Sequence, residues 1–248
     1  MKKLLLTTSL ICLSTVAIAQ EYDYTYAPLE NSAYQMEQEA ETIDPVSKQI
    51  SVLQKEWAHI KYQIADKERQ LEAIHALEDK AARLTATYPL RPEVKIWEGI
   101  ILSTDAGIVK GISALGKVKK AKALFEESLI QDPYALDGSA YTSLGSLYYQ
   151  VPGWPIAFGD KDKAETHLIK ALSLNPDGID PNYFYGDLLL KQDRLQEAKL
   201  YLQRALQAPN RPDRPLADAG RRQEIKAALA ELAQKSQNKS VKDTPHYN

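Results

Sequence analysis

The clearest pattern along the chain is the spacing of its apolar residues over positions 46–87. Apolar residues recur there every three or four positions, which places them on one face of an α-helix. The pattern predicts one long, heptad-like helix over 46–87, ending before Pro89 because a proline disfavours helix at the residue before it. The first members of the apolar seam are Val46, Ile50, Leu53, Trp57 and Ile60.

Two arrangements of this helix fit the pattern. The seam pairs with a second copy of the chain as a coiled coil, which would make a homo-oligomer, or it packs along the body of the same chain. Trp57 favours packing on the body because its side chain is larger than a dimer seam usually accommodates.

The first nineteen residues have the pattern of a secretory signal peptide. Two lysines precede an apolar run over 4–16, and an Ala-Ile-Ala segment ending at Ala19 follows. The run is too short to cross a bilayer as a helix, so no membrane span is expected. We therefore predict cleavage near Ala19-Gln20 and a periplasmic or secreted protein. Cleavage also removes Cys12, the one cysteine, so no disulfide is expected.

An acidic arm follows over residues 20–45, with no Lys or Arg and few aliphatic residues. Such a composition cannot bury much surface and predicts disorder. Alternating tyrosines at 22, 24 and 26 leave open a second role, in which the arm docks on a partner.

A repeat with a period of 34 residues occupies the second half of the chain. Its defining members are small residues interleaved with one large residue, and they recur in register: Ala164, Leu168 and Ala171, then Ala198, Leu202 and Ala205. An earlier, more divergent copy has Gly99, Ala121 and Phe125. These copies predict three helix pairs, over about 93–133, 138–176 and 179–212, within a repeat region of 93–209.

The best copy, Leu144-Gly145-x-x-Tyr148 with Ala164, Leu168, Ala171 and Pro176, resembles the tetratricopeptide repeat family. Paired helices approach closely only where side chains are small, and the final proline ends the second helix. The resemblance implies an all-α solenoid of antiparallel helix pairs. With it we expect a long N-terminal helix, a C-terminal capping helix over 216–234 and a disordered tail over 235–248.

The first helices of the repeats expose candidate binding residues of aromatic and hydrogen-bonding types on their inner face. These are Thr142, Ser146, Tyr149, Gln150, Tyr183, Asp187 and Lys191. Further candidates come from two insertions, one at 151–160 with Trp154 and Phe158, and one at about 103–118. Equivalent points of a solenoid lie on one edge, so the insertions should emerge side by side and line a pocket together; alternatively, each folds back on its own repeat.

A basic segment near the C-terminus contributes Arg211, Arg214 and Arg221. Two interpretations remain: the arginines bind a carboxylate bidentately, or they form a solvated elbow paired with neighbouring acids. Asp180, directly before Pro181, is typical of a helix N-cap.

The chain lacks the usual motifs of an enzyme, a metal centre or a cofactor site, so no catalytic, metal or cofactor-binding residue is predicted. The 31 basic and 33 acidic residues nearly cancel, which gives no reason to expect nucleic-acid binding. The sequence thus favours an exported, non-catalytic scaffold that binds a protein or peptide partner in the cell envelope.

A second hypothesis concerns solute capture. The run from Gly153 to Lys161 and the segments Asn175 to Asp180 and Tyr183 to Tyr185 resemble the periplasmic T-component proteins of TRAP transporters. That resemblance implies capture of a small organic ligand. The chain departs from it at Ile11, which leaves no lipidation site before Cys12.

Overall fold

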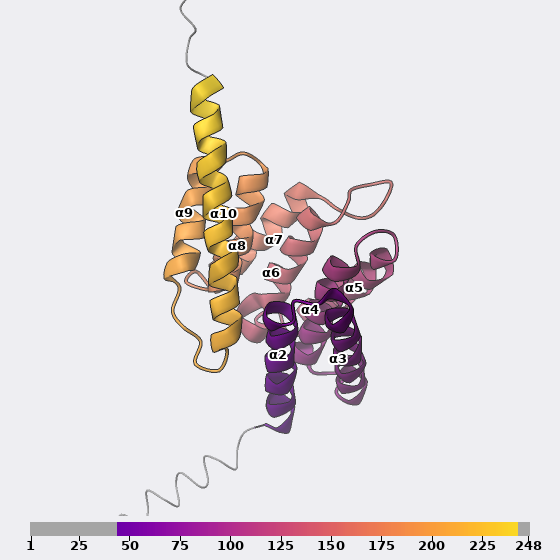
Figure 1. Cartoon of the computed structure of the whole chain (residues 1–248). Helices are drawn as coiled ribbons and strands as arrows, with labels where there is room; N and C mark the ends of the chain where they lie inside the picture. Colours follow the sequence, from indigo (N-terminus) through magenta and orange to yellow (C-terminus); the bar gives the residue numbers. More distant parts are fainter. Residues whose placement is uncertain (1–43, 243–248) are drawn as a thin grey trace, which may run out of the picture. The chain divides into compact units, whose positions relative to one another are not determined.

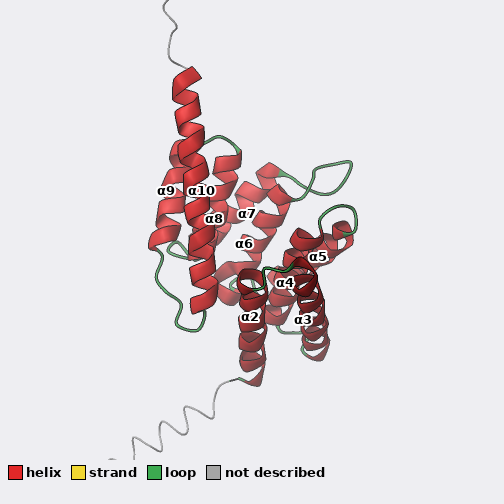
Figure 2. Cartoon of the chain, in the orientation of Figure 1, coloured by secondary structure: helices red, strands yellow, loops and turns green. Residues whose placement is uncertain are grey.

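The computed structural model describes residues 44–242 of the 248. The predicted signal peptide and almost all of the acidic arm lie outside the described residues. The described part is built from helices, joined by short turns and loops (Figures 1 and 2). The helices are α2 (Pro45–Gln63), α3 (Lys67–Thr87), α4 (Pro92–Val109), α5 (Ala114–Gln131), α6 (Ala135–Gln150), α7 (Lys161–Leu174), α8 (Ile179–Lys191), α9 (Leu195–Gln207) and α10 (Pro215–Lys242).

The single long helix predicted over 46–87 is wrong: the segment is a hairpin of two helices, α2 and α3. The chain turns at residues 64–66, where the Asp66 side chain accepts the backbone N–H of Arg69 at 2.9 Å and caps α3. The antiparallel arrangement brings Lys80 to 2.7 Å from Glu56. The apolar seam on each side of the turn therefore faces the other helix and the body.

The seam of α2 is buried inside its own chain. Val46, Ile50, Leu53 and Trp57 are each at most 5% exposed. They belong to a core cluster with side chains of α3, α4 and α10. This corrects the coiled-coil alternative, because a seam already covered by the same chain is not available to a second copy.

Three further helix pairs follow: α4 with α5, α6 with α7, and α8 with α9. In each pair a glycine of the first helix lies against a large buried residue of the second. A Cβ built at the glycine would meet this residue at 2.8 Å or less, so only glycine permits the approach. The contacts are Gly99 with Phe125, Gly145 with Leu168 and Gly186 with Leu202. The all-α, tetratricopeptide-like fold class is confirmed.

The insertion expected over about 103–118 is mostly helical. Helix α4 continues to Val109 and α5 begins at Ala114, so only residues 110–113 form the turn. Buried Ala106 and Val118 extend the apolar contact between the helices. Lys110 and Gly111, both with positive φ, then reverse the chain.

The C-terminal helix α10 is longer than the cap expected over 216–234, and the tail expected to be disordered from 235 is helical to Lys242. Helix α10 packs along α8 and α9 and contacts α2 (Figure 1). Lys235 extends the contact by donating to Asp193 at 3.0 Å. At its other end Gly220 lies against the ring of Tyr62, where a Cβ would come within 2.4 Å. Within residues 44–242, none of the helices combines the length and apolar character that a membrane crossing requires.

Candidate functional site

A pocket of about 370 Å³ lies on the inner side of the repeat array. The first helices of the three repeats, α4, α6 and α8, supply one side of it. The N-terminal hairpin and the start of α10 supply the rest. The N-terminal hairpin and α10 therefore cover part of the inner face, and the space left has the size of a small-ligand site.

Helix α2 contributes an aromatic wall to this pocket. Trp57 donates from its indole nitrogen to the Thr104 hydroxyl at 2.8 Å and packs edge-on against Trp97, with ring centroids 5.8 Å apart. The carbonyl oxygen of Ile100 accepts from Thr104 at 2.9 Å. These contacts hold both indole rings in place beside the pocket.

Hydroxyl and amide side chains make up eight of the remaining lining residues, and most of these lie on α6. Helix α6 presents Ser139, Thr142, Ser143, Ser146 and Gln150 toward the pocket. The serine and threonine side chains are short, which keeps the space open, and all five side chains can donate or accept hydrogen bonds. The pocket thus has the composition of a binding site rather than of a core. Of the inner-face residues predicted on this helix, Thr142, Ser146 and Gln150 line the pocket and Tyr149 does not.

Tyr149, Asp187 and Lys191, also predicted for binding, contact one another instead of the pocket. The Tyr149 hydroxyl donates to Asp187 at 2.7 Å, and the Lys191 ammonium lies 4.9 Å from the Tyr149 ring. Burial, followed by the nearby Asp187 carboxylate, raises the pKa of Tyr149 well above its usual value. This network joins α6 to α8 and fixes the angle between two repeats.

The predicted arginines form a partly buried ion-pair cluster with Asp180, in which Arg221 is the buried arginine. Asp180 accepts from Arg211 and from Arg221, each at 2.8 Å. Burial alone would raise the pKa of Asp180, but the charges of Arg221, Arg211 and Arg214 outweigh it and hold the pKa far below its usual value. The N-cap role predicted for Asp180 is wrong: Gly178 is the N-cap residue of α8 and Asp180 lies in its first turn.

The other cluster contacts match the paired interpretation of the basic segment. Arg211 donates to Asp218 at 2.7 Å, and Arg221 pairs with Glu224. Tyr183 lies against Arg221, whose guanidinium is 4.5 Å from the ring centroid. Burial raises the pKa of Tyr183 to about 12. Arg221 and Arg214 line the pocket, whereas Tyr183 and Arg211 support it from behind.

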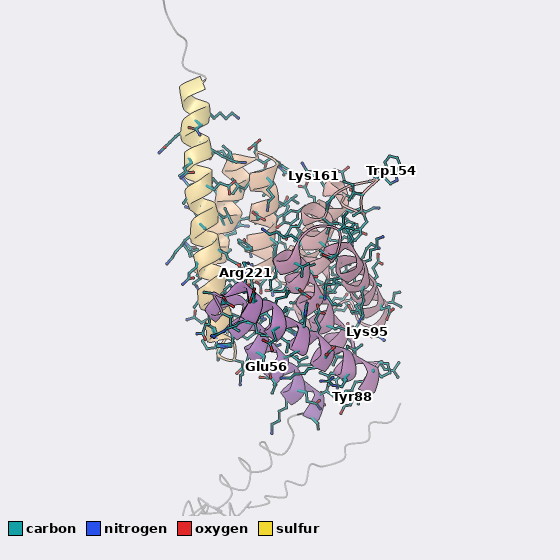
Figure 3. The ribbon with its side chains drawn as sticks, turned by 45° about the vertical axis from the view of Figure 1, so that its right-hand side comes forward. Glu56, Tyr88, Lys95, Trp154, Lys161 and Arg221 are labelled. Atoms are coloured by element: carbon teal, nitrogen blue, oxygen red, sulfur yellow. The ribbon has the colours of Figure 1, made fainter. Side chains whose placement is uncertain are left out.

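The insertion at 151–160 divides into an anchored part and an exposed tip. Phe158 folds back on its own repeat, edge-on to Tyr148 at 5.7 Å, and Asp160 caps α7. Trp154 is 89% exposed and projects from the tip of the loop (Figure 3). The same loop lies beside the turn at 110–113, and together they line a second, mostly apolar pocket of about 440 Å³.

Several pocket residues have no signal in the sequence pattern. Trp57, Trp97 and Lys61 lie on helices with apolar seams, and nothing local marks them as facing a cavity rather than a core. Their position depends on how α2 docks over α4, which is a tertiary contact. Among the described residues, no three His, Cys, Asp or Glu side chains gather as a metal site would require.

Comparison with known proteins identifies the repeat. A family model of the tetratricopeptide repeat matches residues 179–211, which hold α8 and α9. No curated protein sequence matches the chain significantly. The matched segment contains the Gly186–Leu202 contact, and the same contact recurs in the two preceding helix pairs. Residues 179–211 therefore match the tetratricopeptide repeat, and the two preceding helix pairs share its glycine–leucine or glycine–phenylalanine contact.

Proposed function

We propose that this protein is an exported, non-catalytic scaffold of the cell envelope that holds a short segment of a protein or peptide partner in its inner pocket. Tetratricopeptide repeats are protein-interaction modules, so a binding role follows from the fold. The signal peptide predicted from the sequence supports the location, and the pocket supports the site.

The observation that carries the proposal is the composition of the pocket. Hydroxyl and amide groups of α6 and two indole rings line the same space of about 370 Å³. Hydrogen-bonding groups opposite rigid aromatic surfaces suit recognition of a peptide segment. Asp180 is the one acidic residue in the lining, and its two arginine partners hold it ionised, so it is poorly suited to proton transfer.

A pocket-filling substitution tests this proposal. Ser146→Trp on α6 places a large ring in the pocket, whereas Gln203→Trp adds the same ring on the exposed face of α9. Parent and variants are expressed with their leader, tagged and used to recover partners from periplasmic extract, with thermal melting as the folding control.

We expect the same partner with the parent and with Gln203→Trp, and its loss with Ser146→Trp at an unchanged melting temperature. Equal recovery by all three proteins would contradict the proposed site.

A further inference from the structure

The charges beside the pocket do not balance. In the described residues, one partly buried cluster brings four cations, Lys61, Arg211, Arg214 and Arg221, close to three carboxylates. The carboxylates are Asp180, Asp218 and Glu224. Every carboxylate already has a cationic partner. The cluster therefore has one positive charge more than its own acids can neutralise.

Arg214 is the cation of this cluster that forms no ion pair with a carboxylate in the described residues. Its guanidinium makes no hydrogen bond or ion pair with any residue the structure describes, and its Nε is buried without an acceptor. The group lies over the ring of Trp97, 5.0 Å from the centroid, and lines the pocket. Burial, followed by the charge of Arg211, lowers the pKa of Arg214, as expected for a cation held beside another cation away from water.

Two further groups point to a negative occupant. The Trp97 indole N–H is buried without an acceptor beside Arg214. Lys61, whose ammonium lies 3.0 Å from Glu224, also lines the pocket. Burial, followed by the charge of Arg221, lowers the pKa of Lys61 to about 8. A buried donor and an unneutralised cation both cost free energy until an acceptor arrives.

We infer that the pocket binds a carboxylate, held by the Arg214 guanidinium, on a body that packs against Trp57 and Trp97. A planar guanidinium matches a carboxylate with two parallel hydrogen bonds. The hydroxyl groups of α6, which line the same pocket, can bind polar groups of the same molecule. The inference rests on the proposed function, because it names the chemistry of the occupant of the same pocket. The C-terminus of a peptide and a free organic acid present the same group.

The tryptophans provide the assay. The chain has three, of which Trp57 and Trp97 line the pocket and Trp154 is exposed. In a Trp154→Phe background the emission reports on the pocket alone. Two probe pairs are titrated: N-acetyl-leucine with its amide, as a model of a peptide C-terminus, and benzoate with benzamide, as a model of a free acid.

We expect both acids to change the emission and both amides to bind at least about 30-fold more weakly, because the amides lose the charged partner of Arg214. Tighter binding of N-acetyl-leucine assigns the pocket to a peptide terminus, and tighter binding of benzoate assigns it to a free acid. Amides that bind as tightly as the acids would overturn the inference.

Substitutions at Arg214 test its role. Arg214→Gln should abolish the preference for acids, and Arg214→Lys, which keeps the charge without the planar fork, should retain it at reduced affinity. Arg204→Gln, on the exposed face of α9, is the matched control and should bind like the parent. Melting of each variant checks folding. Unchanged acid binding by Arg214→Gln would overturn the inference.

Failure of this inference is distinguishable from failure of the proposed function. If no acid binds while Ser146→Trp still abolishes partner capture, the pocket binds a partner by other chemistry and only the inference is wrong. If the acids bind and Ser146→Trp does not weaken them, they bind outside the pocket, and the inference is again overturned.

Discussion

Two Gly→Ala substitutions, at Gly145 and at Gly116, should have opposite effects on the stability of the fold. Gly145 lies on α6 with no room for a side chain, since an added Cβ would lie 2.5 Å from Cγ of Leu168 and 3.1 Å from the Ala164 carbonyl oxygen. Leu168 is fully buried and cannot move toward solvent. Gly116 on α5 is exposed, and an added Cβ there would meet nothing within 4 Å.

Both substitutions gain the same stability from the higher helix propensity of alanine. Only the one at Gly145 also loses stability, because the added methyl group overpacks the helix contact. Alanine in place of glycine stabilises a helix by about 1 kcal/mol. Overpacking a tight core costs about 1–3 kcal/mol, and the upper end applies at Gly145 because both a side chain and the backbone obstruct the new atom. We therefore expect Gly145→Ala to lose about 2 kcal/mol and Gly116→Ala to gain about 0.5–1 kcal/mol.

Thermal unfolding followed by circular dichroism measures both effects. For a chain of this size, these free energies correspond to a melting temperature lower by about 4–8 °C for Gly145→Ala and higher by about 1–4 °C for Gly116→Ala. Gly99→Ala and Gly186→Ala, which have equivalent contacts, should also melt lower. A Gly145→Ala protein that melts at or above the parent temperature would refute the packing of the repeats described above.

Three further predictions follow from the charges and surfaces. Burial lowers the pKa of Lys61 from 10.5 to about 8, so between about pH 8 and 10.5 the unfolded chain binds more protons than the folded one. The free energy of unfolding should therefore rise with pH over this range, by at most about 3 kcal/mol. Urea titrations at several pH values measure this rise, and Lys61→Met should remove it. Asp180→Asn should lower the free energy of unfolding by about 3–5 kcal/mol at pH 7, because it leaves two arginines without their shared carboxylate. The pKa of Asp180 is lowered in the folded protein, so this loss should shrink as the pH falls below the ordinary value of 3.8 and the carboxylate becomes protonated. An equal loss at pH 2.5 would contradict the ion pairing. Trp154→Ser should leave the melting temperature unchanged because the side chain is 89% exposed, so a large drop would show that the loop tip is packed.

The repeat region was predictable because its signal is local and steric. Only glycine or alanine is small enough for the point where paired helices cross. Small residues such as Gly145 and Gly186 therefore recur at regular intervals along the sequence. The hairpin of α2 and α3 was missed because residues 64–66 contain neither glycine nor proline and the apolar spacing continues almost unbroken across the turn. Only Asp66, as an N-cap, and Lys67, which interrupts the seam, mark the break.

The pocket was harder to predict than the fold. Its inner lining on α6 and α8 follows from the repeat, but Trp57 and Lys61 reach it through the docking of α2, which no local pattern encodes. Asp180 shows the same limit: an aspartate before a proline has the local signal of an N-cap, and only the distant Arg211 and Arg221 give it a different role. The unpaired state of Arg214 likewise appears only when the partners of its neighbours are known.

Site-specific photo-crosslinking shows directly whether the partner binds in the inner pocket. A photoreactive phenylalanine replaces Ser143, which lines the pocket on α6, or Gln203, which is exposed on α9. After irradiation of cells that export the protein, the account predicts a discrete adduct from position 143 and none from position 203, with mass spectrometry placing the linked residue of the partner. Adducts from position 203 alone would contradict it.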